Sequence, residues 1–317
     1  MAETGLRVLI TGGAGMLGRS LARAWEKHRP ADTVIPLTRA DADLRDPLAT
    51  ARAFDAAKPD VVLHCAARVG GIAANIAAPT EFLSDNLAID LNVINSARVA
   101  GVKSLIYFGS SCMYPRDYRQ PLVESDVLAA PLEPTNEGYA LAKIAASKHC
   151  EYISNQYGLA YRVLIPSNLY GPEDHYGSDA SHLIAAAITK AQAAKESDSD
   201  GIEVWGDGTA RREFTYVDDL GAFVATHIDE LATWPHMMNV GLGKDYSVAE
   251  FYEMALAAVG HQAKLLLDPS KPAGMQQKLM DSSLAKRYGW NPTTDAADGI
   301  KSAYDAWITA TNTKDAR

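Results

Sequence analysis

A tyrosine and a lysine four residues apart have the types and spacing for proton transfer at a carbonyl group. Tyr139 and Lys143 occur in YALAK, and a helix would place them on one face. A neighbouring ammonium, together with a positively charged nicotinamide, favours the phenolate and lowers the pKa of the tyrosine. The tyrosine then protonates the alkoxide as hydride reaches the carbon. Ser110, in GSSCMYP, is predicted to bind the same oxygen.

A cysteine and a histidine add a second acid–base pair that hydride transfer alone does not need. Cys112 lies two residues after Ser110, and His182 ends the segment SDASH. Inverting a carbon beside a ketone requires one group to remove a proton and another to donate one on the opposite face. A thiol with a lowered pKa and an imidazole suit these two tasks. Taken singly, Cys112 is also typical of a small buried side chain, and His182 of a helix N-terminus.

The segment TGGAGMLG near the N-terminus has the glycine spacing of a dinucleotide-binding loop. It lies between an apolar run and a predicted helix. Gly12 suits a tight turn, Gly15 a close approach of the backbone to a pyrophosphate, and Gly18 close packing of helix on strand. The helix N-terminus then supplies N–H groups and a positive dipole to the phosphates. This position after the first strand makes the motif much more specific than a glycine-rich turn.

The residues after the second predicted strand favour NADP over NAD. Arg39 stands where a carboxylate would bind the ribose of NAD, and an arginine suits a 2′-phosphate. Asp41 lies close enough to leave NAD open, and Asp43 either accepts from the adenine amine or caps the following helix. The predicted cofactor contacts are Gly12, Gly15, Met16, Leu17, Gly18, Arg39, Asp43, Ala66, Ala67, Tyr139 and Lys143.

Short apolar runs alternate with amphipathic stretches through the first half of the chain. Strands are predicted at 7–11, 33–37, 60–67, 104–111 and 161–171, and helices at 15–28, 46–57, 82–101 and 138–158. This βαβ alternation predicts a Rossmann-type α/β fold with a doubly wound parallel sheet. Helices at 181–195 and 246–260, a strand at 263–268 and mixed strand and loop at 202–219 follow.

Two domains are expected from this change of pattern. Residues 1–170 form the NADP-binding Rossmann domain, with a return segment near 213–244. Residues 171–317 form mainly a smaller C-terminal α+β domain that binds substrate over the carboxyl ends of the strands, where open α/β sheets bind ligands.

The composition argues against nucleic acid and membranes as partners and against secretion. Thirty basic residues against 39 acidic ones give a net charge of −9, which argues against nucleic acid and anionic membranes. No apolar run is long enough to span a bilayer, and the first strand begins too early for a signal peptide. Three cysteines without metal-site spacing are typical of free thiols in a cytoplasmic protein that holds no metal.

The motifs together resemble the GDP-L-fucose synthase family of extended short-chain dehydrogenases/reductases. The resemblance extends from RVLITGGAGMLG through AARVGGIAAN, GSSCMYP, PTNEGYALAK and WGDGTARREFTYVDD to DPSKPAGMQQKLMD. It implies an enzyme that converts GDP-4-keto-6-deoxy-D-mannose to GDP-L-fucose with NADPH, inverting carbons 3 and 5 before reducing carbon 4. It also implies a homodimer formed through a four-helix bundle, here the 82–101 and 138–158 helices.

The resemblance assigns roles to matching residues. Ser110, Tyr139 and Lys143 become the reductive set, and Cys112 and His182 the epimerising pair. The substrate contacts implied are Asn168, Trp205, Arg212 and Lys278.

Two stretches depart from the family pattern and keep other functions open. PEDHYGSDASHLIAA replaces the common PHDNF and SHVIPAL, and Gln277 stands where some members have arginine. The alternatives are a reductase or single-centre epimerase–reductase on a related GDP-4-keto-6-deoxy hexose or heptose, a UDP-sugar 4-epimerase and a non-catalytic NADP-binding regulatory protein. Cys112 and Arg39 count against the 4-epimerase, and the Ser–Tyr–Lys set counts against the regulatory protein.

Overall fold

The central sheet consists of six parallel strands, each formed by a short apolar run of the kind that is typical of buried strands. The computed structural model describes residues 5–177, 181–271 and 275–315. The strand order is β2-β1-β3-β4-β5-β9. The strands are β1 (Arg7–Thr11), β2 (Thr33–Leu37), β3 (Val61–His64), β4 (Ser104–Phe108), β5 (Ala160–Pro166) and β9 (Met237–Val240). The predicted Rossmann-type fold is therefore confirmed.

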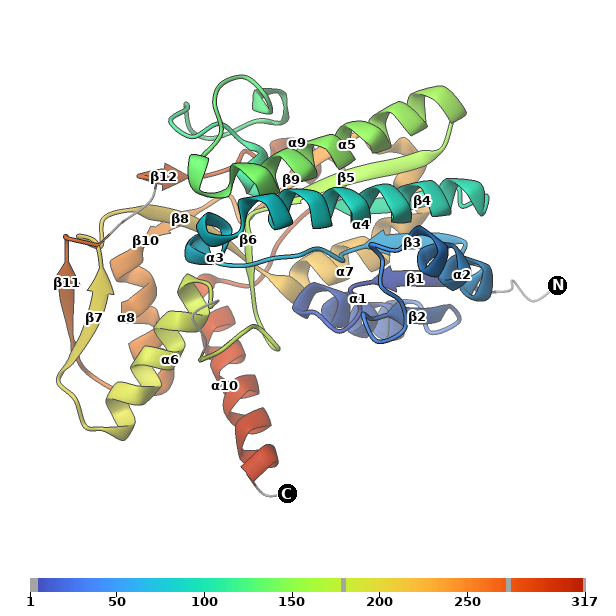
Figure 1. Cartoon of the computed structure of the whole chain (residues 1–317). Helices are drawn as coiled ribbons and strands as arrows, with labels where there is room; N and C mark the ends of the chain where they lie inside the picture. Colours follow the sequence, from blue (N-terminus) through green and yellow to red (C-terminus); the bar gives the residue numbers. More distant parts are fainter. Residues whose placement is uncertain (1–4, 178–180, 272–274, 316–317) are drawn as a thin grey trace.

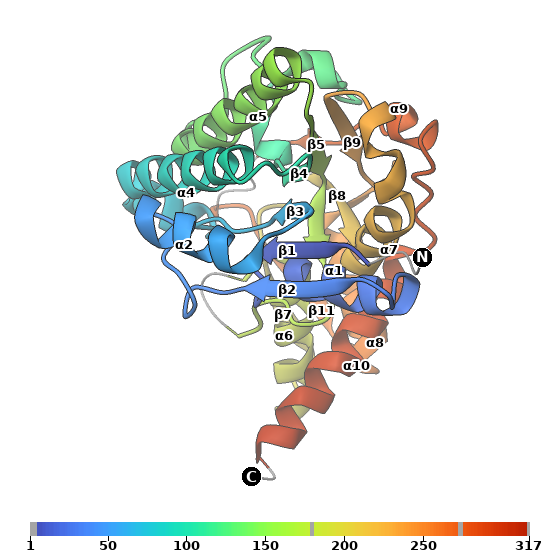
Figure 2. The ribbon, with the colours of Figure 1, turned by 90° about the vertical axis from the view of Figure 1, so that its right-hand side faces the viewer.

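Helices cover both faces of this sheet (Figures 1 and 2). Alternate strand residues face opposite sides. Leu9, Val62 and Leu105 therefore lie in one apolar core, and Val8, Leu63 and Ile106 in the other. The first core contains α2 (Pro47–Ala57), α4 (Pro79–Val99) and α5 (Glu137–Tyr157), and the second α1 (Met16–His28) and α7 (Val217–His227).

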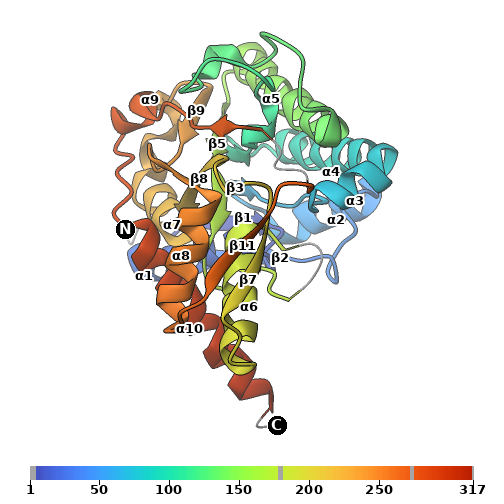
Figure 3. The same ribbon diagram turned by 90° about the vertical axis from the view of Figure 1, so that its left-hand side faces the viewer.

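The later part of the chain forms a smaller unit beside the carboxyl ends of the sheet strands (Figures 1 and 3). Its own core lies between α6, α8 and α10. The strand order β10-β8-β12, with β6 also paired to β8, makes one sheet, and β7 pairs with β11 in another. The elements are β6 (Asn168–Tyr170), α6 (Leu183–Glu196), β7 (Gly201–Trp205), β8 (Arg211–Tyr216), β10 (Asp245–Ser247), α8 (Val248–Val259), β11 (Lys264–Asp268), β12 (Gln277–Lys278) and α10 (Ala296–Asp315).

The chain passes between the two units more than once. β9 and α7 return to the large sheet after β8, and α9 (Ser283–Lys286) packs beside them. Short helices complete the described elements: α3 (Ile72–Ala77), and the 3₁₀ turns η1 (Ser111–Met113), η2 (Glu124–Asp126), η3 (Pro134–Asn136) and η4 (Ile228–Thr233). No helix of the described ranges is long and apolar enough to cross a membrane.

Candidate active site

A cavity of about 1220 Å³ opens at the carboxyl ends of the sheet strands. β1 lies between β2 and β3, so the chain leaves β1 towards one side and later returns on the other. A crevice forms where the strand order reverses in this way, and open α/β sheets bind ligands there. The cavity wall continues into the smaller unit through residues of β6, β8 and β12.

The glycine loop forms one wall of the cavity and has room for a phosphate but not for side chains. Gly12 has φ +69°, and a Cβ on it would lie 2.8 Å from the Ala66 nitrogen. A Cβ on Gly18 would collide with the Gly12 carbonyl, which explains the close packing of α1 on β1. Gly15 begins α1 without a side-chain cap or an acidic residue in the first turn. The free amides therefore suit an anionic pyrophosphate.

In the turn after β2, Arg39, which favours NADP, and Asp41, which left NAD open, have different surroundings. Arg39 lines the cavity, together with Met16, Leu17, Ala66 and Ala67. Asp41 instead accepts hydrogen bonds from the Thr38 nitrogen at 2.8 Å and the Thr38 hydroxyl at 2.6 Å. The Asp41 carboxylate is thus engaged within the turn, which leaves Arg39 as the charged side chain of this turn on the cavity wall.

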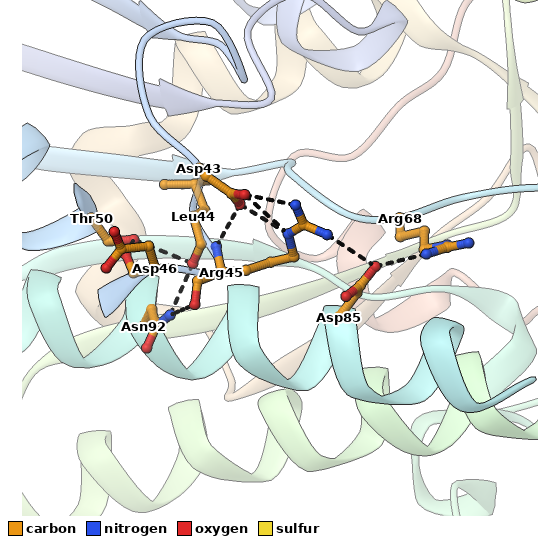
Figure 4. A network of polar contacts seen from close by, with 8 residues as sticks. All are labelled: Asp43, Leu44, Arg45, Asp46, Thr50, Arg68, Asp85 and Asn92. Carbon is orange, nitrogen blue, oxygen red and sulfur yellow. Dashed lines mark hydrogen bonds and ion pairs between the residues drawn. The ribbon is translucent and has the colours of Figure 1, made fainter. Parts of the chain in front are cut away.

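A chain of ion pairs continues from this turn along the cavity (Figure 4). Arg45 binds Asp43, with Nη2 2.6 Å from Oδ2, and lowers the pKa of Asp43 to about 2. Asp85 lies 3.6 Å from Arg45 and 2.8 Å from Arg68. Asp46, rather than Asp43, caps α2 by accepting from the Leu48 nitrogen. Asp43 itself lines the cavity, and a contact with the adenine amine would require this position.

The predicted reductive residues meet where β4 ends and α5 begins. Ser110 follows β4, and its hydrogen bond with Tyr139 lowers the pKa of that phenol. Burial has the larger effect and raises the pKa of Tyr139. The Lys143 ammonium lies 5.9 Å from the Tyr139 ring centre and donates to the Phe108 carbonyl at 3.0 Å. Lys143 alone therefore does not lower the pKa of this tyrosine below its ordinary value, and the positive charge of an oxidised nicotinamide would act in the needed direction.

The two residues of the predicted epimerising pair enter the cavity from different units. Cys112 lies in η1, and its Sγ accepts a hydrogen bond from the Asn136 amide at 3.2 Å. His182 is the N-cap residue of α6, and its side chain lines the cavity. The cavity thus brings Ser110, Cys112, Tyr139, Lys143 and His182 together.

Acidic and basic side chains that the sequence did not single out lie near His182. Asp174 and His175 line the same cavity. Burial raises the pKa of Asp174, and both histidines lower it. They belong to the segment PEDHYG, whose departure from the family pattern was the available signal. Asn136 was missed as well, although it lies in the quoted PTNEGYALAK block.

Three of the four implied substrate contacts lie on neighbouring strands of the smaller unit. Arg212 pairs with Lys278 in the register of β8 and β12, and the Asn168 amide donates to the Glu213 carbonyl at 3.3 Å. All three contacts line the cavity. Arg211 has the opposite orientation along β8 and binds Asp245 at 2.9 Å.

Trp205, the fourth implied substrate contact, does not line the cavity. It ends β7 and is 56% exposed, with the Lys271 ammonium 5.7 Å from its ring centre. A contact between Trp205 and a ligand in the cavity therefore stays a prediction. The described residues contain no group of three or more His, Cys, Asp or Glu side chains placed to hold a metal.

Fold and site together define a nucleotide-dependent enzyme of the Rossmann class, and the chain belongs to the NAD dependent epimerase/dehydratase family, whose model matches residues 8–241. Within that family its relatives include a GDP-L-fucose synthase from Azorhizobium caulinodans, 43% identical over 96% of this chain and 97% of the relative. A GDP-L-colitose synthase from Yersinia pseudotuberculosis is 37% identical over 97% and 99%. These relatives confirm the resemblance predicted from the motifs.

Solved structures agree with this placement. A GDP-6-OMe-4-keto-L-xylo-heptose reductase from C. jejuni superimposes with a TM-score of 0.89 at 29% identity, over 97% of this chain and 99% of that one. A GDP-mannoheptose C4 reductase from Campylobacter jejuni with NADP bound has a TM-score of 0.85 at 29% identity, over 98% and 100%.

Proposed function

We propose that this protein converts GDP-4-keto-6-deoxy-D-mannose to GDP-L-fucose with NADPH. It inverts the two centres that flank the ketone and then reduces carbon 4. The observation that carries the proposal is the meeting of two acid–base sets in one cavity, Ser110–Tyr139–Lys143 beside Cys112 and His182. The relatives named GDP-L-fucose synthase support the same substrate.

In this mechanism Cys112 and His182 act on opposite faces of the sugar. One removes a proton beside the ketone while the other donates one, and Ser110 and Tyr139 stabilise the enolate oxygen. Tyr139 then protonates the alkoxide formed by hydride transfer. The Cys112 thiol is already bound by Asn136, which orients it within the cavity.

NADPH is the proposed reductant, and the large unit is its proposed site. Arg39 on the cavity wall supports a 2′-phosphate, since Asp41 is engaged with Thr38. A related reductase has been solved with NADP bound. Residues 1–170 with the return near 213–244 would hold the cofactor, and residues 171–317 would bind mainly the GDP-sugar. Charge-assisted bonds from Arg212 and Lys278 would then bind the substrate diphosphate.

A homodimer is also part of the proposal. Six large apolar side chains of α4 and α5 are exposed, namely Leu87, Leu91, Leu141 and Tyr152 within the helices and Val99 and Tyr157 at their ends. α4 and α5 lie side by side along one edge of the molecule (Figure 1). A second copy of the same pair would bury these side chains in a four-helix bundle.

The second candidate is a reductase, or single-centre epimerase–reductase, on a related GDP-4-keto-6-deoxy hexose or heptose. The specific observation in its favour is the pair Asp174 and His175 on the cavity wall beside His182, in a segment that departs from the family pattern. Relatives named GDP-L-colitose synthase and heptose reductase support this breadth.

One experiment separates these functions. The enzyme is incubated with NADPH and GDP-4-keto-6-deoxy-D-mannose in D₂O, and deuterium in the product is mapped by NMR. We expect deuterium at carbons 3 and 5 and NADPH-derived hydrogen at carbon 4. Oxidation of NADPH with deuterium at one carbon or none would favour the second candidate. Bound NADPH without turnover of any GDP-keto sugar would favour a regulatory protein.

A further inference from the structure

Beneath the reductive residues lies a buried polar cluster that the proposed mechanism does not yet use. It consists of Asp90 on α4, Tyr107 on β4, His64 on β3 and Thr11 on β1, each at most 1% exposed. Burying a carboxylate among apolar side chains is costly unless it is paired and hydrogen-bonded. Such a group calls for an explanation in terms of its partners.

The Asp90 carboxylate is held from two sides. Tyr107 donates its hydroxyl to Oδ2 at 2.7 Å, and the His64 Nε2 atom lies 3.0 Å from Oδ1. The His64 Nδ1 atom lies 2.7 Å from the Thr11 hydroxyl, which also accepts from the Ala66 nitrogen. Burial lowers the pKa of His64, so the imidazole is neutral, and it lies between the Asp90 carboxylate and the Thr11 hydroxyl.

Lys143 lies on the other side of Tyr107. Its ammonium is 4.5 Å from the Tyr107 ring centre, and the side chain is nearly buried, with 3% exposed. Burial lowers the pKa of Lys143, and Asp90 is the main group that raises it again. The buried ammonium therefore depends on a counter-charge that α4 supplies.

Besides Asp90, three thiols act electrostatically on Lys143, namely Cys65 after β3, Cys112 in η1 and Cys150 on α5. Two of these thiols do not replace the carboxylate. Burial holds the pKa values of Cys65 and Cys150 far above neutrality, so both are uncharged. Tyr107, whose pKa burial also raises, is a neutral donor.

We propose that Asp90 is a positioning residue, a buried counter-charge that holds the Lys143 ammonium beside Tyr139. Asp90 is not among the residues that line the cavity, and it acts through Tyr107 and Lys143. The cluster reaches the glycine loop through His64 and Thr11, because Thr11 precedes Gly12 and accepts from the nitrogen of Ala66, which lies behind Gly12. The same cluster therefore links the cofactor loop to the ammonium that the reduction needs.

Direct titration of Lys143 tests this without any substrate. Lysine is labelled with ¹³C at Cε, and the Lys143 signal is assigned by its loss in Lys143→Arg. We expect Asp90→Asn to lower the Lys143 titration midpoint by about one to three pH units, the effect of losing a close opposite charge. Asp90→Glu keeps the charge and should keep the midpoint near wild type. Asp126→Asn, which removes another buried carboxylate 3% exposed, is the matched control and should leave the midpoint unchanged.

An unchanged Lys143 midpoint in folded Asp90→Asn would overturn the proposal, and so would an equal fall in Asp126→Asn. If Asp90→Asn does not fold, wild-type enzyme labelled at aspartate Cγ decides, with the Asp90 signal assigned by Asp90→Glu. Asp90 must then be a carboxylate at pH 7 and its shift must change again at the Lys143 midpoint; a protonated Asp90 at pH 7 overturns the idea.

The effect of Asp90 on ketone reduction rests on the proposed function and is measured in a separate experiment. In Asp90→Asn the Lys143 ammonium would lose its proton at a lower pH, and removal of the nearby negative charge also lowers the pKa of Tyr139. Where kcat requires both protons, each change lowers its upper pH limit. The limit for ketone reduction in Asp90→Asn should therefore lie about one to three units lower than in wild type. An unchanged limit overturns this effect on ketone reduction. A wild type that reduces no GDP-keto sugar contradicts the proposed function instead and leaves the NMR titration to decide on Asp90.

Discussion

Tyr139 and Cys112 share one cavity but have different polar partners. Ser110 binds the phenol of Tyr139, and Asn136 donates to the sulfur of Cys112. The backbone nitrogen of Cys112 also donates to the Ser110 hydroxyl at 3.3 Å, which fixes the spacing between the two sets. Because the partners differ, single substitutions can separate the two chemistries.

Replacing Tyr139 with phenylalanine removes the proposed proton donor for the alkoxide. We expect NADPH oxidation to fall by about two to four orders of magnitude, the range for losing a general acid. The affinity for NADPH should change little, because the proposed phosphate contacts are the glycine loop and Arg39. Stopped-flow kinetics and cofactor fluorescence measure the two quantities, and near-normal turnover would contradict the role of Tyr139.

Cys112→Ser keeps the shape of the side chain but replaces the thiol with a hydroxyl that hardly ionises at neutral pH. The variant should lose deuterium exchange at the carbons beside the ketone. It should still reduce the unepimerised ketone slowly with NADPH, since Ser110, Tyr139 and Lys143 are intact. NMR of the product in D₂O is the measurement. Fully inverted product at the wild-type rate would mean that another group is the base.

At the scale of elements, the apolar patterns predicted β1 and β2 with their observed bounds and the long helices to within three residues. The predicted strand at 161–171 is instead two strands, β5 and β6, separated at Ser167. β5 pairs with β4 and β9, while β6 pairs with β8, so one apolar run serves two sheets. Periodicity reports which residues are buried but not against which partner strand, and it therefore did not predict this break.

We expect the turn after β2 to determine whether the protein prefers NADPH or NADH. Arg39→Ala should raise the Kd for NADPH far more than the Kd for NADH, because the two differ only by the 2′-phosphate. Arg52→Ala, an exposed arginine on α2 away from the cavity wall, is a matched control. Equal losses for both cofactors in the Arg39 variant would show that the guanidinium does not read the phosphate.

Strand β8 carries a buried acid whose ionisation should destabilise the fold. Glu213 accepts from the Gly243 nitrogen at 2.6 Å and the Met280 nitrogen at 3.0 Å, and burial raises its pKa from 4.5 to about 7. A raised pKa means that the folded state favours the protonated form, so this contribution to stability is complete below pH 4.5 and is lost as pH rises through 7.

Glu213→Gln removes this ionisation and should flatten the pH dependence of stability. We expect the Tm of wild type to fall a few degrees more than that of the variant between pH 5 and 8. Calorimetry of the two proteins across that range is the measurement. Parallel Tm curves would show that Glu213 stays charged in the folded protein.

For the whole molecule, the exposed apolar side of α4 and α5 leads to a prediction about assembly. Leu91 is 52% exposed on α4, and a charge there would be buried in the proposed four-helix bundle. Leu91→Glu should therefore convert a dimer to a monomer, as measured by light scattering during size exclusion. Leu266→Glu, at a similarly exposed leucine on β11, should leave the mass unchanged. A wild type that is already monomeric would contradict the bundle.

The candidate site was predictable where one stretch of sequence contains a complete motif. The glycine loop and the spacing of Tyr139 and Lys143 are local patterns, and the cavity is lined by Gly12, Gly15, Gly18, Tyr139 and Lys143. Asp90 and His64 lie on separate elements, and their contact depends on how α4 packs over β3 and β4. Without that packing, each resembles an ordinary polar residue in its own segment.

The repeated passage of the chain between the two units limits how substrate range can change. The connections among the described residues are β5 to β6, β8 to α7, β9 to β10, β12 to α9 and α9 to α10. The smaller unit is therefore connected to the Rossmann sheet at several points and not by one linker. A recombination event would have to match five junctions at once to exchange it. Acceptance of a new sugar would then require point changes on the cavity wall, where Asp174 and His175 lie.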